Sequence, residues 1–410
     1  MTTGTRRSGV EFIALIALSM SLVAMSIDSM LPALGSIAAD LGARAPNDRQ
    51  LVLSAFFAGL TVGLLVYGPL SDSFGRKPAM YAGLALYVIG GLLCAFTTDF
   101  DLMIAGRVLQ GFGAASPRIV AIAMVRDLHG GRRMARIMSF VMAVFILVPI
   151  LAPSIGQAIL FVAPWRVIFL ALIAVALIFF CWFGLRQPET HPPEARSKFS
   201  LATILNAARQ TFAHPITSGY MIAGGLIFGA FISYLGTSQQ IFQEQYGLGA
   251  LFPVFFGILA AGIGVASITN ARLVMRLGMR TLSKWALRTA CILSAGFLVI
   301  AWALGGHPPI VPFMAYMLLC FFCNGLLFSN YNALAMEPMG HIAGVAAAVT
   351  GAVSTLVALL TGTLIGRFYD GTVVPLIAGF ALLGLGALIV TEWAERNRPV
   401  VSPTASQAKV

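Results

Sequence analysis

GPLSDSFGRKP, residues 68–78, is a short charged stretch between two long apolar runs. It carries Asp72, Arg76 and Lys77, whereas residues 50–67 and 79–98 on either side contain no charged residue. A segment of roughly 20 mostly apolar residues is long enough to cross a bilayer, and a charged connection this short can only turn the chain back at the membrane surface. The stretch therefore predicts a hairpin of two membrane-spanning helices.

The composition indicates the same class of protein. The chain has 410 residues, of which 59% are hydrophobic and only 10% are charged, whereas soluble domains contain about 25% charged residues. A formal charge of +11 would suggest a nucleic-acid partner in a soluble chain. In a membrane protein, basic residues gather on the cytoplasmic side instead, so we expect the lipid bilayer and no nucleic acid as partner.

The cysteines give no sign of a metal or redox site. All five lie within apolar runs, so neither a disulfide framework nor a zinc site is expected. We expect no metal and no cofactor.

Reading the chain for spans of bilayer length predicts twelve helices. The first run extends from Phe12 to about Gly35, which is longer than the core of a signal sequence, so it is expected to be a retained helix. The predicted spans lie near residues 11–35, 50–70, 79–98, 101–125, 136–161, 165–185, 214–240, 249–271, 283–304, 309–335, 342–366 and 373–393.

The spans divide into two sets of six. Residues 186–210 are rich in proline and charge and predict a linker between an N-terminal bundle, 1–185, and a C-terminal bundle, 211–410. An internal repeat supports the division, because Leu273, Leu277, Gly278 and Arg280 align with Leu70, Phe74, Gly75 and Lys77. The fold class expected is an all-α membrane protein of two pseudo-symmetric six-helix bundles.

The basic residues orient these helices. Of the 26 Lys and Arg residues, nineteen fall on the side of the N-terminus, four fall on the opposite side and three lie inside spans. By the positive-inside rule, both termini are expected in the cytoplasm.

Four acid or base side chains lie well inside predicted spans: Asp28, Arg107, Arg118 and Arg288. Such residues usually face a cavity or pair with one another and mark proton or substrate pathways. Arg288 lies near the start of its span, so its side chain is expected to extend to the membrane surface. Asp28 lies about 25 Å along its helix, and Arg107 lies at a similar depth, so we expect them to pair. Arg118 is nearly in phase with Arg107 and is expected to face the same cavity, so the residues expected to serve proton coupling are Asp28, Arg107 and Arg118.

The quoted stretch resembles the loop between the second and third helices of major facilitator superfamily transporters, whose pattern is G-x-L-a-D-r-x-G-R-[RK]. The matching residues are Gly68, Leu70, Asp72, Gly75, Arg76 and Lys77. A second motif of that superfamily, R-x-x-Q-G, is met by Arg107, Gln110 and Gly111. The resemblance implies that Arg107 takes part in proton coupling.

Two further segments are similar to drug:proton antiporters of the bicyclomycin-resistance and phenicol-exporter group. SIDSMLPALG at 26–35 carries an acidic residue, Asp28, separated by two residues from an LPAL sequence, as that group does. VPILAPSIGQ at 148–157 resembles the antiporter motif G-x-x-x-G-P-x-x-G-G and keeps Pro153 and Gly156, but Ala152 and Gln157 stand where glycines are usual.

The resemblance also implies gating contacts and a substrate cavity. Asp127 is expected to reach Arg76, and Asp72 is expected to cap the helix near 342–366, contacts that hold the outward-facing state in the superfamily. Gly75, Pro153 and Gly156 belong to the expected gating elements. Residues expected to line the substrate cavity are Gln110, Phe228, Phe231, Tyr234, Asn324, Asn330, Tyr331 and Asn332.

The function expected from these observations is proton-coupled multidrug efflux by alternating access, by a monomer in a bacterial inner membrane. Its partners would be a small-molecule drug and protons, and a cavity with one carboxylate and up to two arginines favours neutral drugs. An uptake or metabolite transporter of the same fold is the alternative. A membrane-embedded enzyme is less favoured, because no H-E-x-x-H or G-x-S-x-G motif occurs, and no lysine follows a glycine as a P-loop requires.

Overall fold

The computed structural model describes residues 9–196 and 200–398. Within them it is helical throughout, without strands, and it contains twelve helices that are long and apolar enough to cross a membrane. The predicted fold class is confirmed.

The N-terminal half contains α1 Gly9–Asp28, η1 Leu31–Ala33, α2 Leu34–Asp40, η2 Pro46–Gln50, α3 Leu51–Phe74, α4 Arg76–Phe96, α5 Phe100–Leu128, α6 Gly131–Val162 and α7 Arg166–Arg186. The connection to the second half contains η3 Pro193–Ala195 and α8 Leu201–Ala213. The C-terminal half contains α9 Pro215–Gln239, η4 Gln240–Gln245, η5 Gly249–Leu251, α10 Phe252–Leu277, α11 Met279–Ala303, α12 Ile310–Met336, η6 Glu337–Ile342, α13 Ala343–Arg367 and α14 Val374–Arg396.

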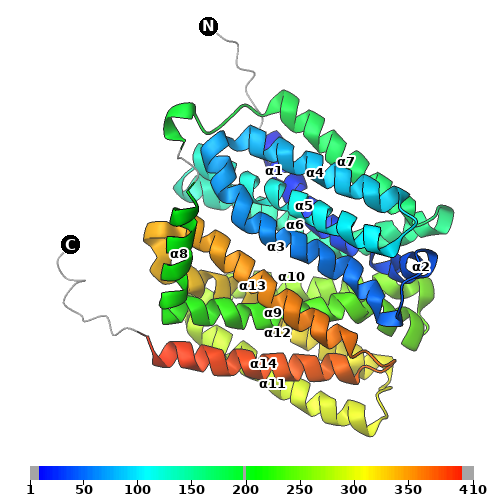
Figure 1. Ribbon diagram of the computed structural model, residues 1–410. Helices are drawn as coiled ribbons and strands as arrows, with labels where there is room; N and C mark the ends of the chain where they lie inside the picture. Colours follow the sequence, from blue (N-terminus) through cyan, green and yellow to red (C-terminus); the bar gives the residue numbers. More distant parts are fainter. Residues whose placement is uncertain (1–8, 197–199, 399–410) are drawn as a thin grey trace.

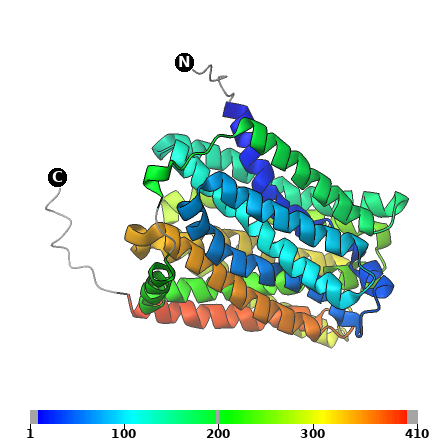
Figure 2. The ribbon, with the colours of Figure 1, turned by 45° about the horizontal axis from the view of Figure 1, so that its top comes forward.

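The long helices gather in two groups. α3, α4 and α5 pack closely on one another, as do α9, α13 and α14, while α3 with α13 and α6 with α10 join the two groups. Figure 1 shows the first group above the second, with α8 running across the others at one end. Figure 2 shows the same separation from a second direction. The exact bundle limits, 1–185 and 211–410 around a linker at 186–210, stay a prediction.

Matching glycine turns mark one end of the two groups. Gly75 joins α3 to α4 with φ 101°, and Gly278 joins α10 to α11 with φ 77°. Both values lie in the region that residues with a side chain avoid. The turns occupy the aligned positions of the sequence repeat. We call the end of the molecule that carries them the inner end, since the sequence predicts it to face the cytoplasm, and the opposite end the outer end.

The first span differs from the prediction. The sequence predicts one helix over 11–35, but α1 ends at Asp28 and the chain continues through η1 into α2. Pro32 explains the break, because proline lacks an N–H and disfavours helical backbone in the residue before it. The expected single helix is therefore wrong, and Asp28 lies at a helix break.

Candidate functional site

Asp28 is the most unusual side chain of the site. It is the last residue of α1 and only 5% exposed. Within the described part of the chain, its carboxylate makes no hydrogen bond and no ion pair. A buried carboxylate without a partner is costly, and in a membrane-spanning segment it marks a functional position.

Arg107 does not form the expected pair with Asp28. Its guanidinium is fully buried and donates to the backbone oxygens of Val52 at 3.0 Å and Ser26 at 3.2 Å, and to Gln110 Oε1 at 2.7 Å. The Phe56 ring lies 4.5 Å from the guanidinium carbon. The prediction of an ion pair was wrong because three other acceptors surround the guanidinium. Arg107 instead ties the last turn of α1 to α3 and α5.

Tyr234 of α9 places a side chain of the C-terminal half near Asp28. Its ring packs against Phe321 at 4.8 Å and Phe256 at 5.7 Å between centroids. Its hydroxyl is buried and has no hydrogen-bond partner in the described residues, and it lies within electrostatic range of Asp28. α9 also packs on η1, just beyond the break. The Asp28 carboxylate and the Tyr234 hydroxyl therefore interact electrostatically across the boundary between the halves.

An aromatic wall continues from Tyr234 along the same boundary. Phe228 and Phe231, both half-buried, stack at 6.0 Å, and Phe57 of α3 meets Phe228 edge-on at 5.9 Å. Phe321 and Phe328 of α12 complete the wall. The sequence analysis missed these last two, although their spacing of seven residues places them on one helix face. Nothing in the apolar sequence around Phe57 distinguishes it.

Three further buried side chains keep polar atoms without partners in the described structure. Gln110 Nε2, Gln157 Oε1 and Asn324 Nδ2 are buried, and none has a hydrogen bond within the described residues. Apolar walls with a few unpaired polar atoms are typical of small-molecule sites.

Two predicted cavity residues are engaged elsewhere. Asn330 and Asn270 exchange amide hydrogen bonds of 2.9 and 3.2 Å between α12 and α10. The Tyr331 hydroxyl lies 3.0 Å from Thr391 Oγ1 of α14. Since these polar groups are already satisfied between helices, we assign them to packing and correct the expectation that they line the cavity. Asn332 is exposed near the inner end of α12.

Arg118 differs from Arg107 although both lie on α5. Its side chain keeps accessible surface although protein atoms surround its position well inside the helix, and no contact is seen for it among the described residues. An exposed arginine at this depth needs water beside it. Arg118 therefore marks a solvent-accessible face of the N-terminal half.

The outer end holds the two halves together. Arg49 donates to Gln239 at 2.8 Å and pairs with Glu244, and Gln50 donates to the Gly366 carbonyl at 2.9 Å and to Gln240 at 3.1 Å. In the described residues, every hydrogen bond seen between the N-terminal and C-terminal halves lies at this end. Besides the contacts of Arg49 and Gln50, Asn47 bonds with Arg367, Tyr369 and Gln240, and Ser54 bonds with Thr363. The outer end is thus closed.

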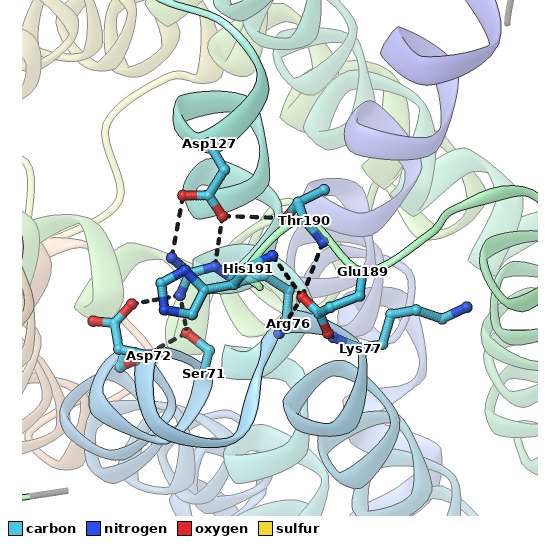
Figure 3. A network of polar contacts seen from close by, with 9 residues as sticks. Ser71, Asp72, Arg76, Lys77, Asp127, Glu189, Thr190 and His191 are labelled. Carbon is cyan, nitrogen blue, oxygen red and sulfur yellow. Dashed lines mark hydrogen bonds and ion pairs between the residues drawn. The ribbon is translucent and has the colours of Figure 1, made fainter. Parts of the chain in front are cut away.

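The inner end carries a network centred on Arg76 (Figure 3). Arg76 is 1% exposed and donates to both carboxylate oxygens of Asp127, at 2.8 and 3.2 Å, and to Ser71 at 2.9 Å. Asp72, at the end of α3, pairs with Arg76 across the Gly75 turn, and no contact with α13 is seen for it in the described structure. The expected cap of the helix near 342–366 is therefore absent here, since Arg76 occupies this carboxylate.

Glu189, which the sequence analysis did not single out, closes the same network from the connecting segment. Its carboxylate accepts from the backbone N–H of Arg76 at 2.9 Å and of Lys77 at 3.0 Å, so it caps the start of α4 (Figure 3). Partial burial acts to raise the pKa of Glu189, but the backbone donors outweigh it and hold the pKa below its usual value. The cap is therefore present at neutral pH and is lost only as the pH falls through that lowered value.

Gly75 is required by the same contacts. A Cβ at this position would lie 2.8 Å from Glu189 Oε2 and 2.8 Å from Arg196 Nη2, in addition to the positive φ. No sequence pattern in the connecting segment indicates that it docks on this turn.

Gly156 allows α6 to touch the break in the first span. A Cβ on Gly156 would lie 1.8 Å from the Ser29 backbone oxygen, so no side chain fits. α6 runs through Pro149 and Pro153 as one helix. Gly156 thus keeps α6 in direct backbone contact with the residue after Asp28.

Replacing Arg76 or Asp127 by alanine is expected to slow transport turnover about tenfold or more while substrate binding stays nearly unchanged. A hydrogen bond to a charged group contributes about 1.5–3 kcal/mol, and this network lies at the inner end, away from Asp28. Binding of a labelled substrate and initial transport rates in vesicles would separate the two effects. Arg132→Ala, an exposed arginine at the same end, is the matched control. Weakened binding with normal turnover would contradict the assignment.

Two surface cavities of about 510 and 490 Å³ do not coincide with this site. The first lies at the outer end beside Asn47 and Tyr369, and the second lies between α11 and α14.

Comparison with known proteins gives consistent results. The family model described as Major Facilitator Superfamily matches residues 16–362. The chain is 30% identical over 380 residues to the uncharacterized MFS-type transporter YdgK of Bacillus subtilis (strain 168), which covers 91% of this chain and 92% of that protein. It is 29% identical over 392 residues to the bicyclomycin resistance protein homolog of Haemophilus influenzae, covering 94% and 95%. The crystal structure of a D-xylose-proton symporter matches with a TM-score of 0.74 over 94% of this chain and 97% of that one, and at 14% identity this likeness shows the fold alone.

Proposed function

Because this chain belongs to the Major Facilitator Superfamily, we propose that it is a proton-coupled exporter of drugs from the bacterial cytoplasm. It is a multi-pass membrane transporter and not an enzyme. A relative named for bicyclomycin resistance, similar over nearly the whole chain, supports a drug as substrate. The exporter works as a monomer in the inner membrane, with both termini in the cytoplasm, as the distribution of Lys and Arg predicts.

The observation that carries this proposal is the unpaired carboxylate of Asp28 at the helix break. It is the only acidic residue deep inside a predicted span, it is nearly buried, and its charge acts on the buried Tyr234 of the other half. Gain or loss of one proton there changes the interaction between the halves, which is what coupling of a proton to a conformational change requires. Asp28 is the proton carrier, and Arg107 is a positioning residue that holds the break.

The contacts between the halves at the outer end and the Arg76 network at the inner end support alternating access. With the outer end closed by Arg49 and Gln50, the exposed Arg118 is reached by water from the inner end. Opening the outer end breaks the contacts of Arg49 and Gln50. Closing the inner end frees Asp72 from Arg76 to cap α13, where the helix dipole favours a carboxylate.

Direction of transport is the point at which the rival function differs. An uptake or metabolite transporter would share the fold, as the likeness to a D-xylose-proton symporter illustrates. Everted vesicles energised by a proton gradient decide between them. Accumulation of drug inside such vesicles supports export, whereas accumulation of a metabolite in right-side-out vesicles, with no drug transport, contradicts it.

Neutral drugs are expected to be exported in preference to quaternary ammonium dyes. With Arg107 withdrawn into the N-terminal half, the site retains one carboxylate, Asp28, and one exposed guanidinium, Arg118, which together give no net attraction for a cation. Exchange of one proton for a neutral drug moves one charge, so the membrane potential assists by about 2.3 kcal/mol per 100 mV, whereas exchange for a monovalent cation forfeits this contribution.

Resistance assays in an efflux-deficient host would test this preference with phenicols and bicyclomycin against ethidium and benzalkonium. Arg118→Ala is expected to increase export of the cations without loss of neutral-drug export. Protection against the cationic compounds alone would refute the preference.

A further inference from the structure

The 490 Å³ cavity between α11 and α14 lies at the inner end and outside the boundary between the halves. Its lining includes Arg280, Lys284 and Arg288 of α11, which follow one another at intervals of four residues and therefore share one helix face. The transport mechanism above uses none of these groups.

The charges in the cavity are unevenly balanced. Arg280 pairs with two carboxylates, Glu337 at 2.5 Å and Glu395 at 3.0 Å, which leaves one negative charge at that end of the cavity. Glu395 also accepts a hydrogen bond from Tyr220. Lys284 and Arg288, by contrast, share the single carboxylate of Glu392, at 3.9 and 3.0 Å. The part of the cavity around Lys284 and Arg288 therefore keeps one positive charge.

A hydroxyl without a partner lies in the same lining. Ser283 is 2% exposed, and its Oγ makes no hydrogen bond within the described residues. A buried hydroxyl usually has a partner, because leaving it unpaired costs about 1–3 kcal/mol. A ligand oxygen in the cavity would satisfy it.

Both helices around the cavity expose apolar side chains along their length. On α11, Ile292 is 73% exposed and Val299 is 66% exposed, and on α14, Leu382 is 67% exposed and Ile389 is 62% exposed. Figure 1 shows α11 and α14 side by side at the edge of the molecule farthest from the N-terminal half, so these faces meet lipid. Trp285, beside the cavity and 66% exposed, suits the level of the headgroups, where tryptophan is enriched. The cavity therefore opens toward the inner leaflet.

We propose that this cavity binds the phosphate of an anionic phospholipid from the inner leaflet. Lys284 and Arg288 supply the positive charge, Ser283 donates a hydrogen bond, and the acyl chains lie along the apolar faces of α11 and α14. One phosphodiester charge balances the one positive charge that Glu392 leaves.

Native mass spectrometry of the full-length protein in detergent tests the proposal with phosphatidylglycerol and phosphatidylcholine as probes. The wild-type protein is expected to retain phosphatidylglycerol in preference. The double variant Lys284→Gln, Arg288→Gln is expected to lose about tenfold or more of this affinity, since each basic residue near an anionic headgroup contributes roughly fivefold. Arg272→Gln, Arg276→Gln on α10 makes the same charge change at exposed positions outside the cavity and is expected to bind like the wild type.

Ser283→Ala keeps every charge and serves if the double variant does not fold; it is expected to weaken phosphatidylglycerol binding about threefold to tenfold. Inorganic phosphate is expected not to displace the lipid. The proposal would be overturned if the protein retained both lipids equally, if the α10 control lost as much affinity as the double variant, or if inorganic phosphate displaced the lipid. It would also be overturned if Ser283→Ala and a folded double variant both bound phosphatidylglycerol like the wild type.

Discussion

Asp28→Asn is expected to reduce drug export to the level of cells without the transporter, while the protein stays folded and inserted. Asparagine has nearly the same shape but cannot take up a proton, and no other acidic residue lies deep within a span. Because the replaced carboxylate has no partner in the described structure, the change removes no contact. The Asp28→Asn protein is expected to be as stable as the wild type or more stable, since an unpaired buried carboxylate is unfavourable.

Two measurements check this expectation. Drug resistance is scored against the amount of protein in the membrane, and proton release on drug addition is followed in everted vesicles. Glu194→Gln, an exposed acid of the connecting segment, is the matched control and is expected to behave like the wild type. Full resistance of a well-expressed Asp28→Asn strain would remove Asp28 from proton coupling.

The second large effect is expected from Arg107→Ala, which should lower the free energy of unfolding by about 3 kcal/mol or more and abolish transport with it. The change leaves the hydrogen-bonding positions at the Val52 and Ser26 carbonyls and Gln110 Oε1 empty inside the N-terminal half, and it removes the group that packs on Phe56. Arg107→Lys is expected to recover little, because an ammonium cannot reach three acceptors with the geometry of a guanidinium.

Thermal unfolding in detergent measures the effect directly. Arg118→Ala, on the same helix but exposed, is the control and is expected to unfold close to the wild-type temperature. If Arg107 instead paired with Asp28 during transport, its removal would raise the pKa of that carboxyl and shift the pH optimum of transport upward. A stable Arg107→Ala protein with such a shift would indicate that Arg107 and Asp28 do form an ion pair during transport, although the structure shows none.

The sequence alone determined the fold class, the number of spans and the inner-end turns. Membrane helices can be recognised in a sequence because lipid requires an uninterrupted apolar run. The charged turn around Asp72 and Arg76 is recognised because it separates two such runs. Asp28, Arg107 and Arg118 were also identifiable from sequence, since charge inside such a run is rare.

What these charges contact was decided only by the tertiary structure. Arg107 and Asp28 share a depth, yet helix rotation and the nearby carbonyls of α1 and α3 direct the guanidinium to backbone oxygens. Tyr234 comes within range of Asp28 because α9 packs on the break at Pro32. Glu189 reaches the start of α4 from a segment more than a hundred residues further along the chain. One-dimensional patterns report how apolar a segment is and which face of a helix a residue shares, whereas contacts across helices depend on their rotation and breaks, which the packing of all the helices fixes together.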